Sequence, residues 1–364
     1  MSAAGPSNTA QTPAASGDRG IPASAPPVRI GIAGVGRMGR HHAENLAQRV
    51  QGAQLIAACS PIAEELAWAR DTLGVPTGFA EYSAMLADPQ IDAVFLATPT
   101  TLHADQIIAA LEAGKHVFSE KPLALNLPDC LRVEAVAAKH PRQKAMIGYV
   151  RRFDPSYRDA FDKIRAGAIG RPFRARSQTA DQNDASGFFV RYAGASGGIL
   201  LDMSVHDIDT VRWLLGAKSA ARVFATGTIA VHEGLREVGD VDNAVATIEF
   251  VDGQIACIYA SRTMAHGHET LTEIVGTAGR LIVGQNPRLN RVEISDAHGV
   301  RNECTPTFYE RFAEAFLNEA QAFVDVARGD LAPPLTLHDA TEATRIGIAV
   351  TQALRTKQQV EVTG

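Results

Sequence analysis

The sequence predicts an α/β fold: an N-terminal doubly wound parallel sheet, followed by a C-terminal α+β domain built on a large, mostly antiparallel sheet. From Val28 onward, short apolar runs alternate with helix-length segments, which is typical of βαβ units. After about Tyr149 this rhythm changes to strand-like runs separated by turns, of which Asp252-Gly253 is a strong hairpin signal. Two long helix candidates then close the chain.

In the first half, five apolar runs are interpreted as strands that are buried on both faces, because they are apolar almost throughout. These are Val28–Ala33, Leu55–Cys59, Ala93–Ala97, Val117–Ser119 and Ala145–Val150. The helices expected between them are Met38–Val50, Ala63–Leu73, Leu102–Ala113 and Pro128–Lys139.

In the second half, the patterns predict helices and strands in a less regular order. The expected helices are Pro155–Ala166, Leu200–Leu215, Glu310–Arg328 and His338–Thr356. The expected strands are Phe173–Thr179, Ala221–Ala230, Ala244–Phe250, Gln254–Ser261, Thr270–Val275, Arg280–Val283 and Arg291–Ile294. We therefore divide the chain into a disordered tail (1–27, almost without large apolar side chains), a dinucleotide-binding domain (28–148) and a second domain (149–364).

Composition limits the function classes. The chain has 364 residues with 35 basic and 40 acidic side chains and a net charge of -5, so nothing indicates a nucleic-acid or membrane-surface partner. No apolar run approaches the ~20 residues that span a bilayer. The four cysteines are scattered without a CxxC pair, which predicts no metal site and favours buried reduced thiols in a cytoplasmic protein.

Residues Gly34-Val35-Gly36-Arg37-Met38-Gly39 spell GxGxxG between the first strand and the first helix, where a dinucleotide fingerprint belongs. Gly34 permits the tight turn, Gly36 lets the backbone approach the pyrophosphate, and Gly39 lets the helix pack closely. The free N–H groups and positive dipole of the helix N-terminus favour phosphates. The motif predicts a Rossmann domain whose loop, Arg37 and Met38 included, binds a nicotinamide dinucleotide.

The same fingerprint expects an acid at the end of the second strand to bind the adenosine ribose. Ser60 stands there instead, and Glu64 and Glu65 are the nearest charges. A serine would not repel a 2′-phosphate, but no Lys or Arg follows closely to attract one. We expect NAD as the cofactor and leave NADP open.

Other strand ends should face the same crevice. Thr98, Pro99 and His103 follow the strand that ends at Ala97, and they are candidates for the cofactor wall; alternatively, Thr100 or Thr101 only caps the next helix. Glu120 and Lys121, in front of a proline, end the strand that begins near His116.

A further motif, Gly197-Gly198-Ile199-Leu200-Leu201-Asp202-Met203-Ser204-Val205-His206, lies in the second half. If the segment is helical, Asp202 and His206 share one face. Removing hydride from an alcohol carbon requires loss of the hydroxyl proton, for which an imidazole is suited. The carboxylate would orient that imidazole, and the two glycines would allow close backbone approach to cofactor or substrate.

Together, GVGRMG, EKP and GGILLDMSVHDID resemble the Gfo/Idh/MocA family, the glucose–fructose oxidoreductase and inositol dehydrogenase group, from Val28 to the C-terminus. Arg151-Arg152-Phe153-Asp154 and the run Ser186–Tyr192 also resemble its inositol dehydrogenases. The resemblance implies that Lys121 contacts the nicotinamide ribose and the reacting hydroxyl, that His206 is the general base, and that Asp202 binds substrate and supports His206.

The resemblance further implies that Arg151 or Arg152 lines the substrate pocket. Strand alternation puts one of them inward, and we choose Arg151. It also implies a dimer or tetramer. The expected activity is NAD(P)-dependent oxidation of a cyclic polyol or sugar, first of all an inositol. The alternatives are an NADPH-dependent keto-sugar reductase and a non-catalytic dinucleotide-sensing regulator.

Overall fold

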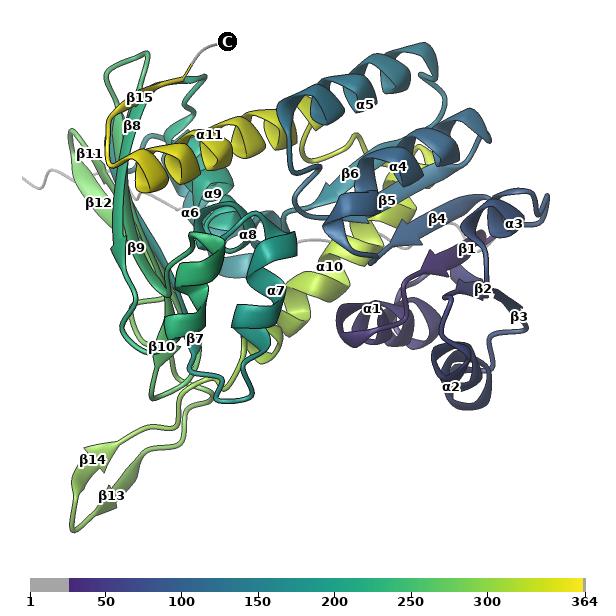
Figure 1. The fold of residues 1–364 in the computed structure, drawn as a ribbon, viewed down its shortest axis with the longest axis horizontal. Helices are drawn as coiled ribbons and strands as arrows, with labels where there is room; N and C mark the ends of the chain where they lie inside the picture. The colour runs from purple at the N-terminus through teal and green to yellow at the C-terminus, as the bar shows by residue number, and fades with distance from the viewer. Residues whose placement is uncertain (1–25, 363–364) are drawn as a thin grey trace, which may run out of the picture.

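The computed structural model describes residues 26–362, so the predicted disordered tail lies almost wholly outside the described residues. The chain forms two large sheets with helices packed around and between them (Figure 1). One sheet has six strands in the order β3-β2-β1-β4-β5-β6, and the other has seven in the order β12-β11-β7-β10-β9-β8-β15. The predicted fold class is confirmed.

The six-stranded sheet is parallel throughout, and its strand order is that of a Rossmann domain. Its strands are β1 (Val28–Ala33), β2 (Ala53–Cys59), β3 (Thr77–Phe79), β4 (Ala93–Leu96), β5 (His116–Glu120) and β6 (Ala145–Gly148). Its helices are α1 (Arg37–Gln48), α2 (Ala63–Leu73), α3 (Tyr82–Leu86), the short η1 (Thr100–Leu102), α4 (His103–Glu112) and α5 (Leu127–Lys139).

All the strands and helices predicted for this half are present. The short β3 and α3 were not predicted, because three and five residues are too few to show a period. The predicted strand Ala145–Val150 ends early, because the chain turns at Val150 into the 3-10 helix η2 (Val150–Phe153). The side chains of β4 are all buried, as expected for a strand covered on both faces.

The seven-stranded sheet is antiparallel except where β7 lies parallel to β10. Its strands are β7 (Pro172–Gln182), β8 (Ala220–Thr228), β9 (Asn243–Phe250), β10 (Ile255–Met264), β11 (Glu269–Gly276), β12 (Gly279–Val283) and β15 (Val360–Glu361). The helices of this half are α6 (Pro155–Arg165), α7 (Phe188–Ser196), α8 (Ile199–Asp202), α9 (Val205–Leu215) and the 3-10 helix η3 (Glu233–Val238).

Two predictions for this half are wrong in detail. The predicted helix Leu200–Leu215 is two helices, α8 and α9, separated at Met203 and Ser204. The predicted strand Arg291–Ile294 is mostly irregular, and only Ile294 belongs to a strand, β13 (Ile294–Asp296). β13 pairs with β14 (Gly299–Arg301) in a hairpin that extends away from the body (Figure 1).

The last two helices connect the halves. α10 (Phe308–Arg328) returns to the parallel sheet, where Phe323 packs edge-on against Phe95 and Phe118. α11 (Leu337–Thr356) lies between the mixed sheet and the Rossmann domain, and it contacts both β8 and α5 (Figure 1). Within residues 26–362, no helix combines the length and the hydropathy needed to cross a membrane.

Candidate active site

The glycine-rich loop between β1 and α1 has the geometry that its fingerprint predicts. Gly34 adopts a φ of 83°, and a Cβ there would lie 2.5 Å from the Ala97 carbonyl oxygen. A Cβ on Gly39 would lie 1.8 Å from the Gly34 carbonyl oxygen, so only glycine permits this approach of α1. At Gly36 the nearest atom to a Cβ would be a Glu65 carboxylate oxygen, at 3.4 Å. The backbone of Gly36 is therefore open to a pyrophosphate.

Arg37 and Met38 begin α1 beside this loop. The Arg37 guanidinium carbon lies 5.0 Å from the ring centre of Phe188 in α7 and 5.7 Å from that of Phe308 in α10. Met38 is half-buried and packs against the hydrophobic core. Arg37 thus connects the dinucleotide loop to two helices of the second half, which the motif alone did not indicate.

Ser60 lies directly after β2 and is 2% exposed. Its hydroxyl donates a hydrogen bond of 2.6 Å to Glu65 Oε2 and accepts one of 3.1 Å from the Ile62 N–H. Ser60 is thus at the predicted strand end, and it holds a carboxylate that comes from α2.

Thr98, Pro99 and His103 lie where β4 leads into α4. The His103 ring is 1% exposed, with Nε2 2.9 Å from the Thr98 carbonyl oxygen and Nδ1 2.8 Å from that of Pro122. Neither Thr100 nor Thr101 caps α4 through its side chain, because α4 follows η1 directly, with Leu102 as its N-cap. His103 therefore joins the loop after β4 to the loop after β5, and we interpret it as support for the cofactor wall.

Glu120 ends β5 and Lys121 follows it, and their side chains have different partners. Glu120 Oε1 lies 2.7 Å from His42 Nε2, and Oε2 accepts a 3.2 Å hydrogen bond from the Lys121 N–H. The Lys121 side chain extends toward the second half, where Nζ donates to the Asp202 carbonyl oxygen (2.8 Å) and to Asp202 Oδ1 (3.2 Å). Within the described chain, the third N–H of this ammonium has no bonded partner.

Asp202 bridges two cations, because its Oδ2 also accepts a 3.0 Å hydrogen bond from Arg262. Burial by itself would raise the pKa of Asp202, but Lys121 and Arg262 outweigh it and hold this pKa below its usual value. Burial would likewise lower the pKa of Lys121, but the carboxylates of Asp202 and Glu120 hold that pKa above its usual value. Lys121 is therefore an ammonium and Asp202 a carboxylate at neutral pH.

His206, in the first turn of α9, does not bond to Asp202, so the predicted support of its imidazole by that carboxylate is wrong. The turn at Met203 and Ser204 interrupts the helix that would have aligned them. Burial lowers the pKa of His206 well below its usual value, and the charges of Lys121 and Arg151 lower it further. The imidazole is neutral at neutral pH, and its Nδ1 is buried with no hydrogen-bond partner among the described residues.

Arg151 and Arg152 are both buried, so the prediction that only one of them points inward is wrong. They lie in the 3-10 helix η2, where strand alternation does not apply. Arg151 donates to Asp207 Oδ1 at 2.7 Å and to Thr179 Oγ1, and Arg152 binds both carboxylate oxygens of Asp209. All of these contacts are with protein groups, and they hold both guanidinium groups in place.

Several groups around Lys121 and His206 were not predicted. Arg262, 1% exposed at the end of β10, keeps two guanidinium nitrogens without hydrogen-bond partners among the described residues. Asp181 Oδ1 lies 2.8 Å from His268 Nδ1. These two residues form an acid–imidazole pair of the kind that was expected between Asp202 and His206. No motif marks these residues, because strands distant in sequence bring them together.

Tyr192 on α7 adds a phenol to the same place. Its ring stacks on Phe188, with 5.3 Å between ring centres. Burial raises the pKa of Tyr192, and the Asp202 carboxylate raises it further. The hydroxyl is therefore protonated at neutral pH and can donate a hydrogen bond.

The two glycines before α8 lie close to other groups of this chain. Gly197 and Gly198 adopt φ values of 85° and 89°, and a Cβ on Gly198 would lie 3.0 Å from Asp240 Oδ1. Both Asp240 carboxylate oxygens accept from the Ile199 N–H, at 3.1 and 3.2 Å. The close approach is therefore to a carboxylate of this chain, which fixes the start of the helix that carries Asp202.

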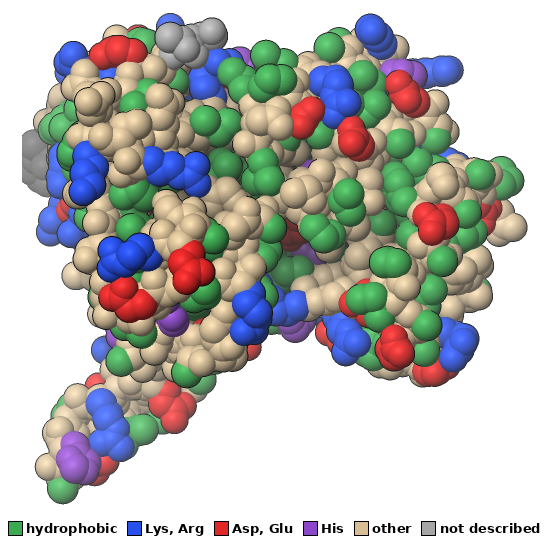
Figure 2. Space-filling model, in the orientation of Figure 1, with side chains coloured by type: hydrophobic (Ala, Val, Ile, Leu, Met, Phe, Trp, Pro, Cys, Tyr) green, Lys and Arg blue, Asp and Glu red, His purple; other side chains and the backbone are tan. Residues whose placement is uncertain are grey.

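These residues lie where the two halves meet. Figure 2 shows this face hollowed between the halves, with acidic and histidine side chains visible at the bottom of the hollow. Within residues 26–362, no group of three or more His, Cys, Asp and Glu side chains is arranged to hold a metal ion.

Comparison with known proteins agrees with this geometry. Residues 28–149 match the model of the oxidoreductase family with an NAD-binding Rossmann fold, Gfo/Idh/MocA, and residues 157–282 match the C-terminal domain model of the same family. The chain belongs to the Gfo/Idh/MocA family. It is an oxidoreductase with an NAD-binding domain, as the sequence predicted.

Relatives in this family match the chain over most of its length. The chain is 37% identical to scyllo-inositol 2-dehydrogenase (NAD⁺) of Bacillus subtilis, over 92% of this chain and 96% of that one. It is 33% identical to myo-inositol 2-dehydrogenase of Thermotoga maritima, over 92% and 98%. The structure of Lactobacillus casei scyllo-inositol dehydrogenase with bound NAD(H) and scyllo-inositol superposes with a TM-score of 0.89 at 38% identity, over 93% and 100%.

The glycine loop fits the cofactor of this family. A Cβ would collide with backbone at Gly34 and Gly39, whereas Gly36 leaves space on the side of the free N–H groups of α1. We therefore expect this loop to hold the pyrophosphate, and the ends of β4 and β5 to hold the nicotinamide half.

Proposed function

We propose that the chain oxidises a ring hydroxyl of an inositol with NAD, and that scyllo-inositol and myo-inositol are the first substrates to test. The main observation behind this proposal is that Lys121 has two of its three N–H groups bonded to Asp202 and one free. The ammonium also acts on the neutral imidazole of His206. The inositol dehydrogenases among the relatives support the substrate class.

In this proposal Lys121 donates its remaining N–H to the reacting hydroxyl and favours the developing alkoxide. His206 takes the hydroxyl proton as general base. NAD⁺ bound at the glycine loop would supply the acceptor for the hydride that leaves the same carbon. The proton and the hydride are both accounted for, and the substrate becomes a ketone.

The free acceptor positions of the Asp202 carboxylate give a physical reason to expect a polyol as the substrate. A carboxylate has about four acceptor positions, two on each oxygen. In Asp202 one position on Oδ1 accepts from Lys121, and one on Oδ2 accepts from Arg262. The remaining positions can accept from a second hydroxyl beside the reacting one. We further propose that residues 28–148 bind the cofactor and residues 149–364 the substrate.

The test is formation of reduced nicotinamide, followed by absorbance, with scyllo-inositol, myo-inositol and a panel of sugars. We expect NAD reduction with at least one inositol and none with Lys121→Ala. Reduction of a keto sugar by NADPH in preference would favour the keto-sugar reductase alternative. Dinucleotide binding without turnover on any substrate would instead favour the regulator.

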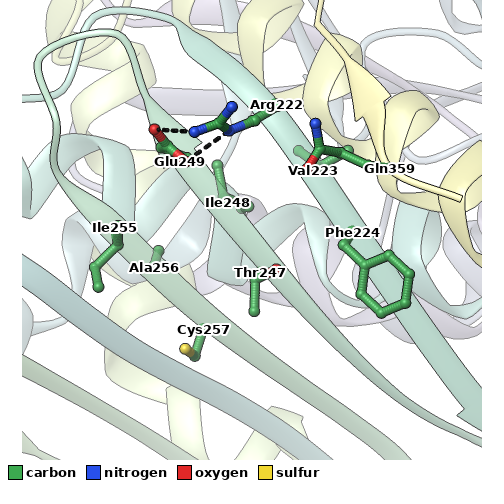
Figure 3. A pocket seen from close by; sticks show the side chains of 10 residues that line it. All are labelled: Arg222, Val223, Phe224, Thr247, Ile248, Glu249, Ile255, Ala256, Cys257 and Gln359. Carbon is green, nitrogen blue, oxygen red and sulfur yellow. Dashed lines mark hydrogen bonds and ion pairs between the residues drawn. The ribbon is translucent and has the colours of Figure 1, made fainter.

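We propose that the outer face of the mixed sheet packs against a second copy of this chain. Helices cover the inner face, whereas Phe224, Val245 and Ile255 on the outer face are 42%, 45% and 44% exposed. Figure 3 shows Phe224, Thr247 and Cys257 side by side on β8, β9 and β10, flanked by the Arg222–Glu249 ion pair. A face of this kind supports the expected homo-oligomer, and light scattering of the purified chain tests it.

A cytoplasmic location is part of the same proposal. Its support is the state of the cysteines, all four of which are free thiols. Burial raises the pKa of Cys59 to about 11 and that of Cys130 to about 12, so both are unreactive. Cys257 and Cys304 are only half-buried, so the predicted burial is confirmed for two of the four.

A further inference from the structure

The end of β2 lacks the residue that a dinucleotide site needs there. In a Rossmann domain, a carboxylate at this point accepts hydrogen bonds from the adenosine ribose hydroxyls and repels a 2′-phosphate. In this chain Ser60 occupies the position and is 2% exposed. A single hydroxyl carries no charge with which to exclude NADP.

The structure brings a carboxylate to this place from another element. Glu65 lies in the first turn of α2, and its Oε2 accepts the 2.6 Å hydrogen bond from Ser60. Its Oε1 lies 3.4 Å from the position that a Cβ on Gly36 would take. The Glu65 side chain therefore spans from the end of β2 to the glycine that faces the pyrophosphate, which is the interval that an adenosine ribose occupies.

The arrangement is held in place. The Ile62 N–H donates to the Ser60 hydroxyl, which directs the hydroxyl hydrogen toward Glu65. Glu65 is half-buried, whereas its neighbour Glu64 is exposed, and the Glu64 side chain makes no hydrogen bond or ion pair within the described chain. The two acids share the first turn of one helix, but only one of them is fixed beside the glycine loop.

We propose that Glu65, positioned by Ser60, accepts hydrogen bonds from the adenosine ribose hydroxyls and makes the site select NAD over NADP. The acid that the fingerprint expects after the strand is supplied five residues later, from the following helix. This inference rests on the NAD-binding domain, and it does not depend on the identity of the polyol.

The proposal has two energetic consequences. A hydrogen bond from a ribose hydroxyl to a carboxylate is charge-assisted, so its loss should weaken NAD binding about tenfold or more. A 2′-phosphate would lie against the same carboxylate, so removal of its charge should strengthen NADP binding. The ratio of the two dissociation constants should therefore change more than either constant alone.

The experiment is titration calorimetry of the full chain with NAD⁺ and with NADP⁺, without polyol, on the wild type, Glu65→Gln and Glu64→Gln. Glu64→Gln is the matched control, because it removes a charge from the same helix turn and costs the same helix-dipole stabilisation. We expect Glu65→Gln to lower the NAD⁺ preference at least tenfold, and Glu64→Gln to leave it within about twofold.

An unchanged NAD⁺ to NADP⁺ ratio in Glu65→Gln, with a melting temperature like that of Glu64→Gln, would overturn the proposal. Ser60→Ala tests the positioning role separately: it keeps the carboxylate but removes its anchor, so the preference should fall by less than in Glu65→Gln. If Ser60→Ala has no effect, the anchoring role is wrong. Failure of every inositol as substrate would leave these binding results unaffected, so the two proposals can fail independently.

Discussion

Two clusters of buried charge act on His206, and they differ in how completely their buried hydrogen-bonding groups are used. In the first, which we call the closed cluster, Arg151, Asp207, Ser177 and Thr179 bond to one another. In the second, the open cluster, Asp202 binds Lys121 and Arg262, and both cations retain N–H groups without hydrogen-bond partners among the described residues.

The difference separates structure from function. A buried polar group without a partner destabilises the fold, so such groups are retained where a ligand will satisfy them. No buried side-chain nitrogen or oxygen of the closed cluster lacks a hydrogen-bond partner among the described residues, so this cluster has little to offer a ligand, however charged it is. The closed cluster should therefore matter mainly for stability, and the open cluster mainly for turnover.

The largest effect should come from breaking the closed cluster. Arg151→Met leaves the buried Asp207 carboxylate, 0% exposed, without its cation, which should cost about 3–5 kcal/mol of unfolding free energy. Urea unfolding measures this cost. A loss below about 1 kcal/mol, together with a large rise in KM for inositol, would instead make Arg151 a substrate ligand, as its family resemblance implied.

The next effect concerns the open cluster. Lys121→Met should lower kcat by about 100- to 1000-fold, because the developing alkoxide loses its charged donor. Its unfolding free energy should change much less than that of Arg151→Met. Lys163→Met is the control for loss of one ammonium, because Lys163 is 54% exposed and lies outside the open cluster. Equal turnover in Lys121→Met and Lys163→Met would remove Lys121 from the mechanism.

The smallest effect should appear in the pH profile. The reaction needs a neutral His206, and its pKa is lowered well below 6.5 by burial and then by Lys121. kcat/KM should therefore be flat from about pH 6.5 to 8, and it should fall only at lower pH, where the imidazole gains a proton. His206→Gln should abolish that acid limb. An acid limb with an apparent pKa at or above 6.5 would show either that His206 is not the base or that Lys121 does not lower its pKa.

The sequence predicted the Rossmann half well because its signals are local. The glycine loop, the apolar strands and the helices each depend on neighbouring residues, and β1 and α2 were predicted with their observed bounds. The exceptions were the short elements β3 and α3. The sequence also showed that no acid stands at Ser60. The role proposed for Glu65 could not be predicted, because it depends on how α2 packs against the glycine loop, and such packing leaves no periodic pattern in the sequence.

The second half shows the limit of the same reasoning. The proximity of Lys121 and Asp202, 81 positions apart, came from family resemblance, whereas helical spacing wrongly paired Asp202 with His206. The break at Met203 and Ser204 could not be predicted, because neither residue is a helix breaker. Arg262 was missed because a lone arginine at the end of a strand looks like any surface cation until its 1% exposure is known.

The path of α10 means that the boundary between the matched family domains is not a folding boundary. Residues 28–149 alone would lose Phe316 and Phe323, and the aromatic faces of His42, Phe95 and Phe118 would be left in water. A truncated N-terminal fragment should therefore aggregate when it is expressed by itself. The intact chain should melt in one calorimetric transition, with calorimetric and van't Hoff enthalpies that agree.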